Sequence, residues 1–523
     1  MKIKEENLRV TAEDIRSMYD RYHFPDDIRQ NIEKELLLPH GLLNRLHAAY
    51  PMHSGLKEQA EFMFNDKPRY AGIKGFREIV EILKANGIEI GHLKERELFI
   101  DVYRFMATRH ALNTINWSRF AKDSVFQLLF PQPGMINEKT VKQYSEATTD
   151  EERQKIVADY QKLTNPHDGK QKLNKPWFVN DDGEVEILQG SQHKYPLCQL
   201  IFDKSTQNCF AFCSYCFRHA QVRGDEDMFV QDDIDQIHQY LRQHKEVSDI
   251  LITGGDAGYI PFDRLKAYVK PMVEDTEMLH IKTLRMGSRL LTFQPEVILS
   301  SKYNPILELF RELTHNGIQV AWMGHFSTPR EIINPSTIAA IRRLKHYGVT
   351  VKSQSPIMHH ISMFSDDNGE IDIDRSAQNW IDLGNILAML GVGFHSMYCA
   401  RPTGEHHYFT APLAAINKVF SKVYRELASI SRPSRYITMT SSAGKISMLG
   451  TAEVNGETVF ALKFNEGRNM EWLDKVYLAK YDDQENTIEK LKPYDTDKYF
   501  YEDELEEIER GLTEALEQQL NEE

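Results

Sequence analysis

The sequence predicts an α/β fold: a full or partial (β/α) barrel, preceded by a helical N-terminal region and followed by a C-terminal extension. From about residue 195, short apolar runs alternate with amphipathic segments of helical period, an order typical of parallel strands joined by helices. The chain has 523 residues, 41% of them hydrophobic, so it can bury a large core and is expected to form two or three domains. We assign residues 1–190 to the helical region, 191–450 to the barrel and 451–523 to the extension.

The N-terminal region carries helical patterning with charged faces, as at residues 26–46, and nothing in it suggests chemistry. Residues 165–190 are rich in Asn, Asp, Gly and Lys and are expected to form a loop or linker. The first six residues lack the apolar core of a signal peptide, and no apolar run approaches the ~20 residues that a membrane span needs. We therefore expect a cytoplasmic protein that has no membrane partner.

Seven apolar runs are expected to be the parallel strands of the barrel: 197–202, 250–253, 283–286, 319–323, 350–353, 393–397 and 436–439. Three segments between them have helical period: 304–316, 335–347 and 376–390. Beyond residue 450, a hairpin candidate at 454–457 leads to an acidic helix at 503–523. That helix is expected to face solvent or a second copy of the chain, so a homo-oligomer remains open.

Charge and cysteine content narrow the class of protein. Lys and Arg total 63 against 77 acidic residues, a formal charge of -14, so no global basic field exists to hold nucleic acid. Only five cysteines occur, and three of them fall within residues 209–216. This clustering favours a metal site in a reducing compartment over a disulfide framework.

The three clustered thiols, Cys209, Cys213 and Cys216, follow the first strand in a CxxxCxxC spacing. Thiolates are the natural ligands of iron–sulfur clusters, and three of them leave the fourth iron of a [4Fe-4S] cluster open to a ligand. A ferredoxin-type carrier needs a fourth thiolate, which Cys198 and Cys399 do not supply at a matching spacing. Structural zinc usually takes paired CxxC knuckles. Three unrelated buried cysteines are the bland alternative.

This motif, with Tyr215 before the last cysteine, resembles the signature of the radical S-adenosylmethionine (SAM) superfamily. The resemblance implies that SAM binds the open iron and is cleaved to a 5'-deoxyadenosyl radical, with an external one-electron reductant. It also assigns a role to Gly254, Gly255 and Asp256 after the second strand, which resemble a segment that contacts the SAM amino group. The bland alternative is a strand-to-helix turn in which Asp256 caps the helix.

Further polar residues stand where later strands end, the place where barrel chemistry belongs. These candidates for cofactor binding are Ser288, Arg289, His325 and Gln354. Taken singly, Arg289 could instead form a surface ion pair, and His325 could be a structural histidine.

The ordered motifs CxxxCxxCFR, LITGGDA, RMGSR, GHFSxP and SQS, over about residues 190–450, resemble the lysine 2,3-aminomutase family. That family combines SAM with pyridoxal 5'-phosphate (PLP) and moves an amino group between carbons 2 and 3. The resemblance makes Lys445 the Schiff-base candidate, although the segment before it is TSSAG instead of a run of glycines. Lys194 is the candidate for the PLP phosphate, since Cys198 replaces an arginine of the family. Arg218, directly after the cluster motif, is the candidate clamp for a substrate carboxylate.

The same resemblance argues against lysine as the substrate. The two aspartates that bind the distal ammonium of lysine correspond approximately to Ala400 and Thr438. Arg401 stands beside Ala400, and His406 and His407 follow, groups that suit a neutral or anionic substrate.

Three functions remain open from sequence. The first is a PLP-dependent radical SAM 2,3-aminomutase acting on an amino acid other than lysine. The second is a PLP-free radical SAM enzyme that performs another hydrogen abstraction. The third is a non-catalytic iron–sulfur protein for electron transfer or sensing.

Overall fold

The computed structural model describes residues 11–36, 41–53, 63–165, 171–224, 228–434 and 436–522. Four of the expectations above fall wholly or partly outside them. The first six residues, residues 37–40 of the expected helical stretch, residues 166–170 of the expected linker and residue 523 of the tail helix lie outside the described residues.

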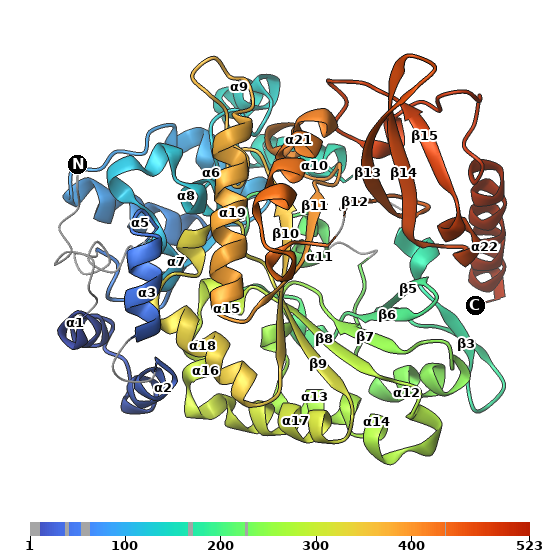
Figure 1. Cartoon of the computed structure of the whole chain (residues 1–523), viewed down its shortest axis with the longest axis horizontal. Coiled ribbons are helices and arrows are strands. Elements are labelled where there is room, and N and C mark those ends of the chain that lie inside the picture. Colours follow the sequence, from blue (N-terminus) through green and yellow to red (C-terminus); the bar gives the residue numbers. More distant parts are fainter. Residues whose placement is uncertain are drawn as a thin grey trace.

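The centre of the molecule is one sheet of eleven strands in the order β15-β14-β13-β12-β11-β10-β9-β8-β7-β6-β5 (Figure 1). The strands from β6 to β12 pair in parallel, and all seven runs expected to be strands are confirmed. Their bounds are β6 (Cys198–Ile201), β7 (Asp249–Ile252), β8 (Thr283–Ser288), β9 (Gln319–Gly324), β10 (Thr350–Ile357), β11 (Gly393–Cys399) and β12 (Ile437–Thr440).

The sheet has two ends, so a closed barrel is not confirmed. It begins at β5 (Ser191–Tyr195), antiparallel to β6, and ends in the antiparallel strands β13 (Gly444–Val454), β14 (Glu457–Gly467) and β15 (Val476–Lys480). Side chains nevertheless link the far parts of this order. Lys194 on β5 donates to the carbonyl of Ser441, and the Lys445 ammonium on β13 lies 4.8 Å from the ring centre of Tyr195.

The expected helices are confirmed, and each packs beside the strand that follows it. Helix α17 packs against β9, α18 against β10 and α19 against β11. Their bounds are α17 (Asn304–His315), α18 (Pro335–His346) and α19 (Ile373–Met389). Helix α17 shows why these segments are helical: its buried residues Ile306, Leu307, Phe310 and Leu313 recur with helical spacing, and each fully buried side chain contributes ~1.5–3 kcal/mol.

The N-terminal region is mainly helical, as expected, and is drawn in blue at one side of the sheet in Figure 1. It packs against α16 (Glu296–Leu299), where Asn31 of α2 donates to the carbonyl of Leu299 at 2.8 Å. Its elements are α1 (Ala12–Tyr22), α2 (Asp26–Leu36), α3 (Gly41–Ala49), β1 (Arg69–Ala71), α5 (Gly72–Ala85), α6 (Leu93–Val102), β2 (Met106–Thr108), α7 (Arg109–Thr114), α8 (Ser124–Leu129), α9 (Glu138–Glu146) and α10 (Asp150–Leu163).

The C-terminal extension continues the sheet. The expected hairpin is present between β13 and β14, where Asn455 and Gly456 adopt positive φ values of 52° and 82°, as a tight hairpin turn requires. The acidic helix is α22 (Glu502–Glu522). Because β13 runs through residue 450, the division of the chain at that residue stays a prediction. None of the described helices is both long and apolar enough to cross a membrane.

Candidate functional site

The cysteine loop lies between β6 and α11 (His219–Arg223), at the carboxyl end of the first parallel strand. The N-terminal region holds it in place. The amide of Phe212 donates to the carbonyl of Met106 at 2.8 Å, the amide of Ser214 donates to the carbonyl of Leu128 at 2.8 Å, and the Ser214 hydroxyl donates to the carbonyl of Gln127 at 2.6 Å. The N-terminal region, in which we expected no chemistry, therefore holds the cysteine loop through three hydrogen bonds.

The three thiols of this loop lie close enough to influence one another. Burial raises the pKa of Cys209 well above its usual value, and the charges of Cys216, Asp256 and Cys213 raise it further. Burial, and next the charge of Cys213, raises the pKa of Cys216 to about 12. Proton loss from this set therefore needs a compensating cation, as a metal cluster would supply.

The donor set fits an iron–sulfur cluster, because it consists of three soft sulfur ligands on one loop. Within the described part of the chain, no group of three or more His, Cys, Asp and Glu side chains could hold a single metal ion. The cluster assignment of Cys209, Cys213 and Cys216 stays a prediction.

The two glycines after β7 let that strand approach the cysteine loop. Gly254 has a φ of 134°, and a Cβ placed on it would lie 2.5 Å from the Thr206 hydroxyl oxygen. On Gly255, a Cβ would lie 2.7 Å from the carbonyl oxygen of Asn208. Any side chain here would push the turn away from the segment that enters the cysteine loop.

Asp256 caps the short turn that follows. One carboxylate oxygen accepts from the amide of Gly258 at 2.8 Å, and the other accepts from the amide of Arg289 at 2.9 Å. Burial raises its pKa to about 6. The capping role that sequence left as the bland alternative is therefore present, and a contact with SAM stays a prediction.

Arg289 is buried and joins three strand ends, so it is not a surface ion pair. Its Nη1 donates to the Tyr215 hydroxyl at 2.7 Å and lies 3.7 Å from the Cys213 sulfur, and its Nη2 forms a close ion pair with Glu331 after β9. The Nε of Arg289 is buried without a partner among the described residues. Its neighbour Ser288 accepts from the amide of Leu290 at 3.0 Å.

His325 directly follows the last residue of β9, whereas Gln354 lies inside β10, because that strand continues to Ile357 beyond the expected end at residue 353. Burial, with the charges of Arg289 and Arg218, lowers the pKa of His325 to about 3, so its imidazole is neutral at physiological pH. The charges that act on His325 place it among the residues around the cysteine loop. Gln354 is half-buried at a register shift between β10 and β11, and its role stays a prediction.

Arg218 is tied to the glycine turn. Its Nη1 donates to the Thr253 hydroxyl at 2.6 Å and to the carbonyl of Gly254 at 3.2 Å. Its guanidinium carbon lies 5.0 Å from the ring centre of Phe202 and 5.6 Å from that of Phe217. The role of Arg218 as the expected carboxylate clamp stays a prediction.

The expected PLP residues are engaged with protein groups. Lys445 and Glu466 stand opposite each other on β13 and β14 and form a close ion pair. Burial lowers the pKa of Lys445, but Tyr195, Glu466 and Tyr398 raise it more, so the net pKa lies above the usual value. A Schiff base needs an unprotonated amine. The ammonium of Lys194, the phosphate candidate, donates to the carbonyl of Ser441.

The segment before Lys445 is also closed by hydrogen bonds. The Ser441 amide donates to the carbonyl of Gly444 at 2.7 Å, and the Gly444 amide donates back to the Ser441 hydroxyl at 3.1 Å. A Cβ on Gly444 would lie 2.2 Å from the carbonyl oxygen of Glu466. In this arrangement the residues do not fit PLP attached at Lys445.

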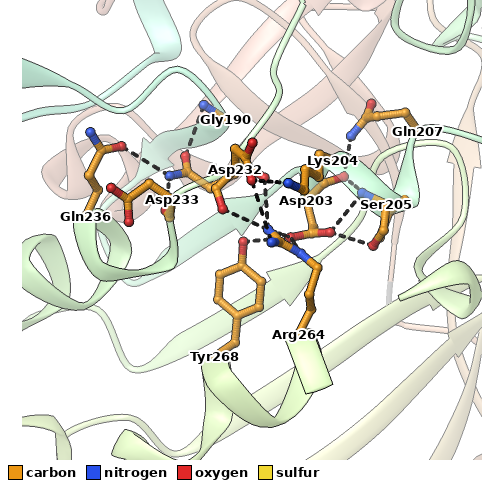
Figure 2. Close-up of polar contacts among 12 residues, drawn as sticks. Gly190, Asp203, Lys204, Ser205, Gln207, Asp232, Asp233, Gln236, Arg264 and Tyr268 are labelled. Carbon is orange, nitrogen blue, oxygen red and sulfur yellow. Dashed lines mark hydrogen bonds and ion pairs between the residues drawn. The ribbon is translucent and has the colours of Figure 1, made fainter. Parts of the chain in front are cut away.

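Sequence reasoning missed the polar network that supports the start of the cysteine loop (Figure 2). Asp203, fully buried after β6, accepts from Arg264 Nε at 2.8 Å, from the Tyr268 hydroxyl at 2.9 Å and from the Ser205 amide at 2.8 Å. Arg264 also donates to the carbonyl of Asp232 at 2.9 Å. The Asp-x-Ser sequence at 203–205 is a recognisable turn signal, but its partners on α13 (Phe262–Val269) lie about 60 residues away.

The fold and the site together define a class: an α/β protein whose parallel strands carry a three-cysteine loop, a glycine turn and a buried arginine at adjacent carboxyl ends. No family model matches the chain. Curated relatives do. A candidate L-lysine 2,3-aminomutase of Aquifex aeolicus is 27% identical over 276 residues, 53% of this chain and 68% of that protein.

Two further relatives are the L-lysine 2,3-aminomutase of Clostridium subterminale and the glutamate 2,3-aminomutase of Clostridioides difficile. The first is 26% identical over 36% of this chain and 42% of its own length. The second is 28% identical over 30% of this chain and 34% of its own length. The match thus spans about two thirds of the Aquifex protein and less than half of these two. The resemblance is confirmed: the chain is a divergent relative of the lysine 2,3-aminomutases, the radical SAM family that its motifs resemble.

Among solved structures, the FeFe-hydrogenase maturase HydG from Carboxydothermus hydrogenoformans covers 67% of this chain and 66% of its own at 12% identity. Its TM-score of 0.26 is too low to carry an argument.

Proposed function

We propose that this chain is a radical SAM enzyme of the isomerase type, related to the aminomutases, that holds a [4Fe-4S] cluster on Cys209, Cys213 and Cys216 and acts on an amino acid other than lysine. The observation that carries the proposal is the three-thiol loop at the carboxyl end of β6, braced by the N-terminal region and adjoined by the glycine turn and Arg289. The names of the curated relatives support the reaction class.

When bound, the cluster and SAM supply an electron and a 5'-deoxyadenosyl radical that removes a hydrogen atom from the substrate. This chain's own residues hold and shield them. The three thiols would bind three irons of the cluster and leave the fourth open. Arg289 places a buried positive charge 3.7 Å from the Cys213 sulfur, which favours the thiolate form.

Aromatic side chains and the capped turn complete this environment. Phe210 and Tyr259 stack at 4.0 Å between ring centres, and the Tyr259 hydroxyl donates to the carbonyl of Cys209 at 3.3 Å. The stacked pair covers the start of the loop and excludes water from it. Asp256 keeps the ends of β7 and β8 in register and offers its remaining lone pairs to an ammonium group.

The close pair of Lys445 with Glu466 favours the PLP-free version of this enzyme over a PLP-dependent one. A protonated lysine in an ion pair is a poor nucleophile. In the PLP-free enzyme, Lys445 and Lys194 link the β5 and β13 parts of the sheet and do not bind a cofactor. The reaction would be a hydrogen abstraction on the same scaffold without an amino group held as an imine.

The testing experiment is an absorbance spectrum of anaerobically reconstituted protein, with and without PLP, before and after borohydride, followed by peptide mapping. We expect a broad iron–sulfur band, reductive cleavage of SAM to 5'-deoxyadenosine, and no reduced imine on Lys445. A band without SAM cleavage would instead support a non-catalytic iron–sulfur protein. An imine mapped to Lys445 would restore the PLP-dependent aminomutase.

A further inference from the structure

Two guanidinium groups share one aromatic ring beside the cysteine loop. The ring belongs to Phe217, the residue directly after Cys216. The guanidinium carbon of Arg218 lies 5.6 Å from its centre, and that of Arg401, which follows β11, lies 5.8 Å from it. The ring thus holds two cationic forks near each other at the carboxyl ends of β6 and β11.

The two arginines differ in what they contact. Arg218 uses Nη1 for Thr253 and Gly254. Arg401 forms no ion pair, and its guanidinium makes no hydrogen bond, with any residue that the structure describes, although it is only partly exposed. A desolvated guanidinium without an acceptor is costly, and a planar fork of this kind matches a carboxylate.

Lys194 and Arg468 add positive charge near Arg401, and the carboxylates of Glu489 and Glu509 offset only part of it through space. Burial, and next the charges of Arg401 and Arg468, lowers the pKa of Lys194 well below its usual value. Lys194 and Arg468 donate to neutral carbonyl groups, those of Ser441 and Ser442. Among the described residues, no carboxylate forms an ion pair with Lys194, Arg218, Arg401 or Arg468. The nearby Glu489 accepts from the amide of Ser442 instead.

We propose that the substrate is a dicarboxylic amino acid: Arg218 binds its α-carboxylate, and Arg401 binds the carboxylate of its side chain. This rests on the proposed function and names its substrate class. Two carboxylates would neutralise the two forks on Phe217 and leave the intervening carbons beside the cysteine loop. Arg401 is accordingly the specificity-determining residue, since an uncharged or cationic side chain leaves its donors unmatched.

The test is anaerobic isothermal titration of the reconstituted protein, in the presence of SAM and without reductant, with glutamate, glutamine and lysine as probes. Glutamine matches glutamate in shape and lacks only the charge. We expect glutamate to bind at least about tenfold more tightly than glutamine, and lysine to bind more weakly still. The Arg401→Gln variant should bind glutamate and glutamine equally, and Arg401→Lys should restore part of the preference.

Arg375→Gln is the matched control. Arg375 also lies over an aromatic ring, 4.4 Å from the centre of Phe364, but it is exposed on α19 and remote in sequence from the site. This variant should keep the full preference for glutamate. If Arg401→Gln keeps it too, if lysine binds most tightly, or if glutamate does not bind, the substrate assignment is overturned.

The same samples separate this inference from the proposed function. Iron–sulfur absorbance and SAM cleavage are measured on each one after reductant is added. Cleavage without a preference for dicarboxylates overturns the substrate class alone. A preference for dicarboxylates without SAM cleavage overturns the proposed radical reaction but supports a dicarboxylate-binding site at Arg218 and Arg401.

Discussion

Two parts of the sheet carry the residues that sequence singled out, and they behave differently. At the ends of β6 to β9, those residues form one buried network around the cysteine loop. The guanidinium of Arg289 contacts Tyr215 and Glu331, and its backbone amide donates to the Asp256 carboxylate. At β5 and β13, Lys194 and Lys445 contact only protein groups, a carbonyl and Glu466. The residues that match the family motifs thus form one network at the first place, whereas at the second each lysine is engaged by a protein group.

The largest effect is expected from Cys213→Ala, which tests the first half of this comparison. Removing one of three thiolates leaves the cluster with too few ligands, so SAM cleavage to 5'-deoxyadenosine should be abolished. Chromatographic detection of 5'-deoxyadenosine from reduced, reconstituted protein measures it. Cys399→Ala, which removes a thiol outside the loop, should keep the cleavage. Cleavage that persists in Cys213→Ala would sink the cluster assignment.

Glu331→Ala should destabilise the fold strongly, because it leaves the buried Arg289 without its ion-pair partner. The exposed fractions of the two side chains are 8% and 2%, so a loss of about 3–5 kcal/mol in the free energy of unfolding is expected. Urea unfolding of the apoprotein measures it. The double variant Arg289→Met with Glu331→Leu should recover most of that loss, and a double variant as unstable as Glu331→Ala would contradict the argument.

Glu405→Gln should change how stability depends on pH. Glu405, after β11, accepts from the hydroxyls of Tyr103 at 2.8 Å and Tyr160 at 3.0 Å, and burial raises its pKa to about 7. Because the pKa of Glu405 is higher in the folded chain, folding is favoured when its carboxyl is protonated. This stabilisation is complete below the unfolded pKa of 4.5 and is lost as the pH rises to about 7. The loss is up to about 3 kcal/mol.

The side-chain amide that Glu405→Gln introduces would still accept from the tyrosines but would not ionise. The free energy of unfolding should therefore fall less from pH 5 to pH 8 in the variant than in the parent chain. An equal fall in both would show that another group dominates between these pH values.

The smallest effect is expected from Lys445→Ala, at the other end of the comparison. The exposed fractions of the Lys445 and Glu466 side chains are 20% and 36%, so solvent screens the pair and its loss should cost only about 1 kcal/mol. The variant should keep its iron–sulfur band and SAM cleavage. Loss of cleavage with an intact band would give Lys445 a role in the reaction and reverse the comparison.

Much of the fold could be read from sequence because periodicity is a local signal. The seven strands and the helices α17, α18 and α19 lie where their apolar patterns indicated. The contribution of the N-terminal region could not be read, since Met106 and Leu128 bind the cysteine loop through backbone carbonyls, which every residue type carries. The Asp203 network was missed for a related reason: its partners come from a distant helix.

The sequence by itself determined which groups this protein has for its chemistry: three thiols at a fixed spacing, a glycine turn and arginines after strands. Spacing along the chain is enough to recognise the three thiols, because side chains on one short loop stay close together whatever the rest of the fold is. Only the tertiary structure decided which of these groups are available. Lys445 and Glu466 are 21 residues apart but stand opposite each other across two strands, whereas Arg218 and Arg401 come from separate loops to one ring. Charge pairing acts through space, so Lys445 is neutralised by a partner that the sequence does not mark, whereas Arg401 has no ion-pair partner among the described residues.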